Sequence, residues 1–116
     1  MLPAVAQGAI GIECRADDAD TRLLLAALND RPTAICVAAE RAFLAALDGS
    51  CRTPIAGLAT LAGETVSFRG LIVRPDGSET LAAQREAGAG DAALLGKALG
   101  DELRGRAGPG FFDGAA

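Results

Sequence analysis

Residues 54–86 have the sequence PIAGLATLAGETVSFRGLIVRPDGSETLAAQRE. Much of this stretch alternates apolar and polar side chains with a period of two, which is typical of strands that bury one face. The predicted strands cover residues 54–62, 64–74 and about 79–86. Gly63 marks the first turn, and the PDGS sequence at 75–78 marks the second, because proline presets φ and glycine accepts a positive φ. We therefore predict an antiparallel meander of three strands.

Helical spacing of apolar residues is found on both sides of this meander. Asp18 is suited to cap a first helix. Pro32 is suited to open a second, because its missing N–H would have no partner in a first turn. The predicted helices span residues 18–29, 32–47 and 91–104. Gly96 and Gly100 inside the last helix each cost roughly 1 kcal/mol relative to alanine, so tertiary packing must stabilise that helix.

The element order α-α-β-β-β-α predicts an α+β domain of two layers. The apolar sheet face carries Val66, Phe68 and Ile72, and we expect about three helices to cover it. Phe43 lies on the apolar face of the second helix and is therefore a predicted core residue. Ala9–Ile12 is apolar and partly β-branched, which predicts a short N-terminal strand before the domain.

Length and charge limit the classes of function. A chain of 116 residues suits one domain. Its net charge of −4 argues against a nucleic-acid partner that is held through its phosphates. No apolar run approaches the ~20 residues that span a bilayer, which argues against a membrane partner. We expect a cytoplasmic protein.

The chain contains no histidine, which excludes Ser-His-Asp and Cys-His catalysis within it. Cys14, Cys36 and Cys51 include no C-x-x-C pair, which argues against a zinc ribbon or a disulfide scaffold and for a reducing compartment. All but one of its basic residues are arginine. A GC-rich genome would explain this bias, and so would recognition of carboxylates by the planar guanidinium group.

Cys51 is the candidate of greatest interest, because it lies between a predicted helix and a predicted strand in LDGSCRTP, residues 47–54. Arg52 would favour its thiolate, whereas a position just past a helix C-terminus would disfavour it. From this chemistry alone, an inert loop thiol is the better interpretation. Cys36, within a helix, and Cys14, at the end of the N-terminal strand, are expected to be structural.

The acidic residues offer little chemistry. Asp17, Asp18 and Asp20 cluster at a helix start, and capping explains them better than metal binding does. Glu40 and Arg41 are expected on a solvated helix face, with an interdomain ion pair as the alternative. No residue of this chain is assigned a catalytic or metal-binding role.

Two parts of the chain together resemble a known family. Residues 2–13, LPAVAQGAIGIE, resemble the LPAVGQGAIGIE stretch of hydroxymethylbilane synthases, also called porphobilinogen deaminases. AERAFL at 39–44 and LDGSCRTPI at 47–55 resemble the family's AERAFL…L-x-G-G-C-x-x-P-I signature. Two positions depart from this pattern, because Ala6 and Ser50 stand where the family has glycine.

The resemblance implies that Cys51 carries a dipyrromethane cofactor through a thioether and that Gln7 and Gly8 lie close to it. It also implies an enzyme that joins four porphobilinogen molecules into hydroxymethylbilane, with loss of ammonia, in porphyrin and haem biosynthesis. The catalytic aspartate and the Arg/Lys array for substrate carboxylates would belong to N-terminal domains that this chain lacks.

On this interpretation residues 1–15 are a connecting strand from the catalytic domains, 16–108 are the dipyrromethane-attachment domain and 109–116 are a tail. The chain alone is then expected to be inactive, with a free Cys51 thiol. Residues 8–14 would pair with a second copy as a homodimer or with the edge of the chain's own meander, or fray. The alternative is a stand-alone α+β binding module with an incidental loop cysteine.

Overall fold

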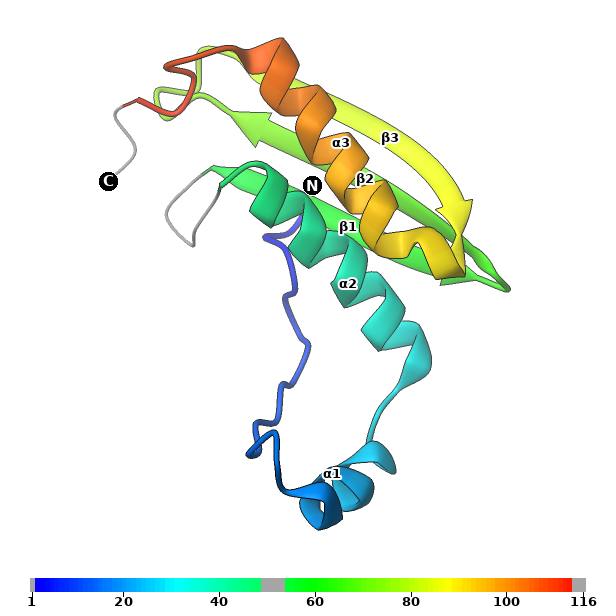
Figure 1. Ribbon diagram of the computed structural model, residues 1–116. Helices are drawn as coiled ribbons and strands as arrows, with labels where there is room; N and C mark the ends of the chain where they lie inside the picture. Colours follow the sequence, from blue (N-terminus) through cyan, green and yellow to red (C-terminus); the bar gives the residue numbers. More distant parts are fainter. Residues whose placement is uncertain (1, 49–53, 114–116) are drawn as a thin grey trace.

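The structure is a computed structural model that describes residues 2–48 and 54–113. The predicted element order is confirmed, and Figure 1 shows an α+β arrangement with a sheet behind a helical layer. The elements are α1 (Ala19–Ala26), α2 (Arg31–Ala46), β1 (Ile55–Ala62), β2 (Thr65–Val73), β3 (Thr80–Gly88), a short 3-10 turn (Ala89–Asp91) and α3 (Ala92–Ala107).

The meander is also confirmed, with strand order β1-β2-β3 and antiparallel pairing throughout. Val66, Phe68 and Ile72 alternate along β2 and are fully buried, as the period of two predicts. The second turn forms as expected, because Asp76 Oδ1 accepts the Ser78 N–H at 2.9 Å and Gly77 has φ +77°.

Helices α2 and α3 lie side by side across the buried face of the sheet (Figure 1). Phe43 of α2 is fully buried, which confirms its place in the core. Its ring packs on that of Phe68 with 4.9 Å between centroids. A side chain at Gly70 would collide with the Phe43 ring, since an added Cβ would lie 2.5 Å from its Cζ. The absence of a side chain at Gly70 therefore leaves space in the sheet for the Phe43 ring of α2.

Two glycines allow the helices to pack closely. A Cβ at Gly96 of α3 would lie 1.9 Å from the carbonyl oxygen of Ala39, and one at Gly100 would lie 2.6 Å from the Cβ of Ala46. Such distances are below any tolerated contact, so the two backbones approach this closely only because α3 has glycine there. Tertiary packing thus compensates the low helix propensity of these residues, as the sequence predicts.

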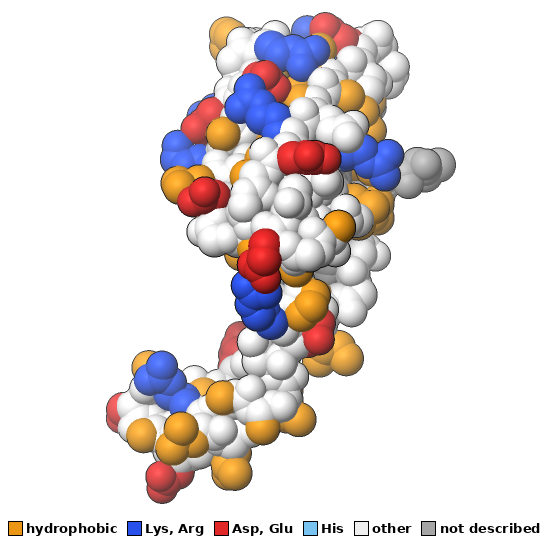
Figure 2. Space-filling view, turned by 90° about the vertical axis from the view of Figure 1, so that its right-hand side faces the viewer, with side chains coloured by type: hydrophobic (Ala, Val, Ile, Leu, Met, Phe, Trp, Pro, Cys, Tyr) orange, Lys and Arg blue, Asp and Glu red, His pale blue; other side chains and the backbone are white. Residues whose placement is uncertain are grey.

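The first helix differs from the prediction, because α1 does not cover the sheet. It has no buried residue, and it lies apart from the two-layer body in Figure 1. Figure 2 shows hydrophobic side chains at the surface of this lobe, and Leu23, Leu24 and Leu28 are 74%, 75% and 68% exposed. Two helices rather than three, α2 and α3, form the layer that covers the sheet.

The predicted N-terminal strand is wrong for the isolated chain. Residues 9–15 are not hydrogen-bonded into a sheet, and Ile10 is 92% exposed. A strand exists only when a neighbouring backbone satisfies its N–H and C=O groups, and no strand among residues 2–48 and 54–113 pairs with this segment. The described residues include no helix with the length and apolar character required to cross a membrane.

Candidate functional site

Cys51 lies outside the described residues, but the chain on either side of it is anchored in the core. The helix before it ends at Ala46 and is capped by Leu47, whose side chain is 4% exposed and whose N–H is donated to the carbonyl oxygen of Phe43 at 3.2 Å. The strand after it is preceded by Pro54, whose carbonyl oxygen accepts the Val73 N–H at 3.0 Å. The two stems that flank the Cys51 segment in sequence therefore have fixed positions.

Gln7 and Gly8 lie in a turn formed by residues 5–8. Ala6 before Gln7 and Gly8 after it both have left-handed backbones, with φ of +58° and +81°. Glycine accepts such a φ without strain, whereas alanine is disfavoured there by roughly 1–2 kcal/mol. The family sequence that this stretch resembles has glycine at position 6, and the left-handed backbone explains that preference. Ala6 is therefore a strained residue of this chain.

The turn borders a hollow of about 330 Å³ between α2 and β1. Its other walls are apolar or weakly polar, apart from the Glu40 carboxylate, and the lining includes Pro32, Thr33, Cys36, Val37, Leu58, Ala59 and Leu61. Both Gln7 and Gly8 are exposed on its rim. The structure thus presents the Gln7 amide to solvent while its backbone follows the domain surface.

Glu40 is a residue that the sequence reasoning missed. Its expected place was a solvated helix face, but the side chain is only 7% exposed. One carboxylate oxygen accepts the Ala6 N–H at 2.6 Å, and the other accepts the Ala59 N–H at 3.2 Å. These two hydrogen bonds make the burial of a carboxylate tolerable. Its spacing of three residues from Phe43, on one side of the helix, is the signal that could have placed it inward.

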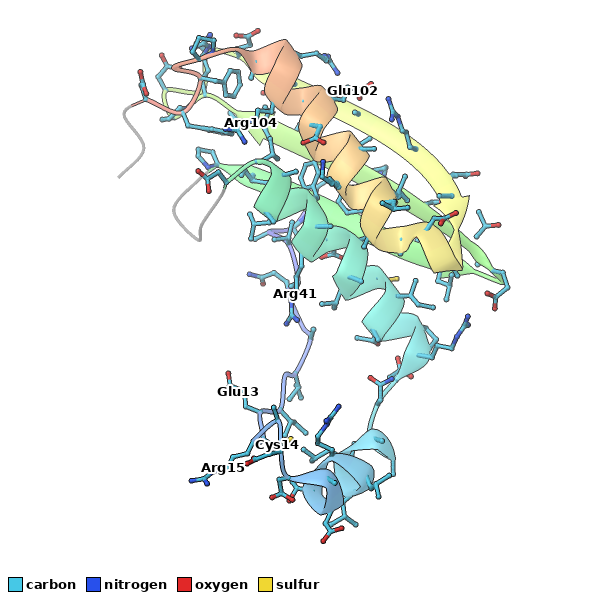
Figure 3. The ribbon with its side chains drawn as sticks, viewed as in Figure 1. Glu13, Cys14, Arg15, Arg41, Glu102 and Arg104 are labelled. Atoms are coloured by element: carbon cyan, nitrogen blue, oxygen red, sulfur yellow. The ribbon has the colours of Figure 1, made fainter. Side chains whose placement is uncertain are left out.

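Arg41, the other half of that predicted pair, is exposed as expected. It lies on the side of α2 toward the N-terminal segment (Figure 3), where it lines a second hollow with Gly8, Ile10 and Ile12. The guanidinium group is therefore available on the same side of the domain as the turn.

The two described cysteines differ in their surroundings. Cys36 is partly buried in the hollow, and burial together with the nearby Glu40 charge raises the pKa of its thiol. A thiol in this state is a poor nucleophile, in agreement with its predicted structural role. Cys14 is exposed beside α1 with Glu13 and Arg15 (Figure 3), so the expected structural role finds no packing contact to support it.

Capping accounts for the acidic residue at the start of α1. Asp18 accepts the Thr21 N–H at 3.0 Å and the Thr21 hydroxyl at 2.7 Å, and these hydrogen bonds lower the pKa of Asp18. Asp30 caps α2 in the same way through Thr33, which lowers its pKa as well. Among residues 2–48 and 54–113, no three His, Cys, Asp or Glu side chains gather as a metal site would require.

Comparison with known proteins places the chain. Residues 34–105 match the family described as "Porphobilinogen deaminase, C-terminal domain". The chain is 64% identical, over 97% of its length, to "Porphobilinogen deaminase" of Paracoccus denitrificans. It is 51% identical, over 96% of its length, to the protein of the same name from Nitrobacter winogradskyi. It spans 36% and 35% of these relatives. The chain belongs to the porphobilinogen deaminase family and corresponds to its C-terminal domain.

Proposed function

We propose that this chain is the cofactor-carrying domain of a hydroxymethylbilane synthase. The whole enzyme, a transferase, would join four porphobilinogen molecules into hydroxymethylbilane with loss of ammonia, in tetrapyrrole biosynthesis. The observation that carries the proposal is the family match over residues 34–105, because this range includes the LDGSCRTPI sequence around Cys51. The same match favours this role over that of a free-standing binding module.

Cys51 is proposed as the attachment point, through a thioether formed by its Sγ. When bound, dipyrromethane would supply the primer to which porphobilinogen units are added. The anchored stems at Leu47 and Pro54 support this role, because they fix where the Cys51 segment leaves and rejoins the core. A residue that carries a growing chain needs a fixed attachment point, because each addition requires the chain to be oriented toward the reacting groups.

The exposed groups of the N-terminal turn fit such a cofactor. Pyrrole units with carboxylate side chains require donors, and Gln7 presents a neutral amide on the rim of the hollow. Gly8 has no side chain to obstruct a close approach to the backbone. Arg41 provides a guanidinium group on the same side of the domain, and this group binds carboxylates in a planar, two-point geometry. Gln7 and Gly8 are therefore proposed as cofactor contacts.

The proposed partners are porphobilinogen and the N-terminal domains of the enzyme, which would supply the acid–base groups. Without those domains the chain would be inactive, and Cys51 would remain a free thiol in the cytoplasm. Residues 8–14 would then pair with a second copy, because Ile10 and Ile12 are exposed and their backbone lacks strand partners. Protected amides at Ile10 and Ile12 in a dimer would support this pairing, and rapid exchange in a monomer would exclude it.

Intact mass tests the attachment. This chain would be fused to the part of the Paracoccus relative that it does not match, and the purified fusion protein would be weighed. We expect an increase by one dipyrromethane unit, its loss in Cys51→Ser and its retention in Cys36→Ser. An unmodified fusion protein that is folded and soluble would overturn the proposal. The chain alone should show neither the added mass nor turnover of porphobilinogen.

A further inference from the structure

Glu40 is the single buried charged residue that the structure records among residues 2–48 and 54–113. It lies on α2, and its two oxygens accept backbone N–H groups from positions 34 residues before it and 19 residues after it in sequence. A buried carboxylate is costly unless both oxygens are satisfied, so these two contacts define where the side chain can lie. The carboxylate connects three segments of the chain at one point.

The geometry of β1 explains why an acceptor is needed there. This strand pairs only with β2, so alternate N–H groups along its other edge have no strand partner. The N–H of Gly57 is donated to the carbonyl oxygen of Pro3 at 2.9 Å. The next outward N–H, that of Ala59, is donated to Glu40 at 3.2 Å. The N-terminal segment thus follows the edge at Pro3 and has left it at Ala59, where Glu40 supplies the acceptor.

The same carboxylate holds the segment at the point of departure. The Ala6 N–H is donated to it at 2.6 Å, a short hydrogen bond to a charged acceptor. Ala6 adopts φ +58°, a left-handed conformation that is strained for alanine and that the hydrogen bond to Glu40 helps to hold. Gln7 follows directly, with its side chain exposed. Glu40 therefore acts on the backbone of the turn and leaves the Gln7 amide free to meet a ligand.

We infer that Glu40 is a positioning residue for Gln7, holding the turn of residues 5–8 against the edge of β1 so that the Gln7 amide faces the cofactor. This inference rests on the proposed function for the role of Gln7, but the anchoring of the turn stands on the hydrogen bonds alone. Glu40 is buried and both its oxygens already accept backbone N–H groups, so its effect on the reaction would pass through Gln7.

Amide hydrogen exchange on this chain tests the anchoring. In Glu40→Gln, one carboxylate oxygen becomes an NH₂ group that cannot accept either N–H. The one remaining oxygen can satisfy only one of the two N–H groups, so we expect exchange at Ala6, at Ala59 or at both to accelerate by about tenfold or more. Exchange at the buried β2 amides should stay unchanged. Glu86→Gln makes the same chemical change on exposed β3, where Glu86 accepts the Ser67 hydroxyl, and should leave Ala6 unaffected.

Two results would overturn the anchoring. Exchange at both Ala6 and Ala59 could equal that of the original chain, or every amide could accelerate by the same factor, which would indicate a purely global effect. Should Glu40→Gln fail to fold, Glu40→Asp gives the same comparison, because it keeps the charge but withdraws it by one methylene.

The fusion protein tests the link to Gln7. With the Cys51 adduct in place, we expect Glu40→Gln and Gln7→Ala each to lower kcat about tenfold or more, and the double variant to be no slower than Gln7→Ala alone. The inference would be overturned if the two single variants' losses in kcat multiplied in the double variant, or if Glu40→Gln left kcat unchanged, in either case with the adduct present. Absence of the adduct from the unaltered fusion protein would instead refute the proposed function and leave the exchange result intact.

Discussion

The two-layer body and the arm formed by residues 9–29 each contain a leucine-bearing helix, but only the helices of the body are buried. Helix α1 has the sequence ADTRLLLA and buries nothing, whereas α3 buries Leu95, Leu99 and Leu103 at 6%, 0% and 0% exposure. Leu24 and Leu28, in and just after α1, are at helical spacing, as are the three leucines of α3. The difference is the partner surface, since α3 meets the backbone of α2 through its glycines and the sheet through its leucines. Apolar periodicity therefore predicts a helix, and only a complementary face makes that helix part of a core.

The largest effect is expected from Phe43→Ala, in the middle of the body. The ring is fully buried, packs on Phe68 at 4.9 Å and occupies the space left by Gly70. Its removal leaves a cavity that backbone glycine cannot fill, so the free energy of unfolding should fall by about 3–5 kcal/mol. Urea denaturation followed by circular dichroism would measure it. An unfolding midpoint equal to that of the original chain would mean that α2 does not pack by this face.

Gly96→Ala should have the next largest effect, because it tests the helix crossing directly. The added Cβ would lie 1.9 Å from the Ala39 carbonyl oxygen, so α2 and α3 must separate. Even with a gain of roughly 1 kcal/mol in helix propensity, we expect a net loss of about 1–3 kcal/mol. Gly105→Ala in the same helix is the control. It meets nothing within 4 Å and should be neutral or slightly stabilising in the same urea titration.

A smaller effect is expected where the arm joins the body. Ala6→Gly relieves a left-handed residue at φ +58° and should stabilise the turn, or the whole chain, by up to about 1 kcal/mol. Gly8→Ala introduces the same strain at φ +81°, where no atom obstructs the new Cβ, and should destabilise by a similar amount. Thermal melts and exchange at Ala59, whose N–H is donated to Glu40, would measure both variants. Shifts of the same sign would show that backbone strain is not the cause.

The N-cap residues of α1 and α2 provide a further comparison of the stability of the arm with that of the body. Asp18 and Asp30 make the same hydrogen bonds, to Thr21 and Thr33. Asp30→Ala should lower the global stability, because α2 belongs to the body, whereas Asp18→Ala should only unwind α1. Both pKa values are lowered from 3.8. Their stabilisation is therefore present above pH 3.8 and is lost as the pH falls through the lower folded-state values. Amide exchange in α1 that is unaffected by Asp18→Ala would contradict the capping role of Asp18.

Local signals predicted the body well and its long-range contacts poorly. The alternation through Phe68, the turn at Gly77 and the apolar face of α2 depend on near neighbours in sequence, and all three are confirmed. The spacing of Glu40 from Phe43 indicates the inward side of α2, but its hydrogen bonds depend on N–H groups that residues 6 and 59 bring to it, and no pattern around residue 40 encodes those two partners. The expected strand at Ala9–Ile12 failed for the same reason, since strand formation requires a distant partner. Cys51, the main predicted site residue, lies outside the described residues and stays a prediction.

Leu24→Gln should have the smallest effect, although it places a polar group at the centre of an apolar sequence. The side chain is 75% exposed in α1, so little apolar surface returns to water when it is replaced. The free energy of unfolding should change by less than about 0.5 kcal/mol. Leu99→Gln is the matched control, because that side chain is fully buried and a buried amide without a partner should cost several kcal/mol, on the order of 3. Urea titration of both variants compares arm and body directly. A loss in Leu24→Gln as large as that in Leu99→Gln would require α1 to be covered in solution, by a second copy or by the body itself, and would break the distinction between the two regions.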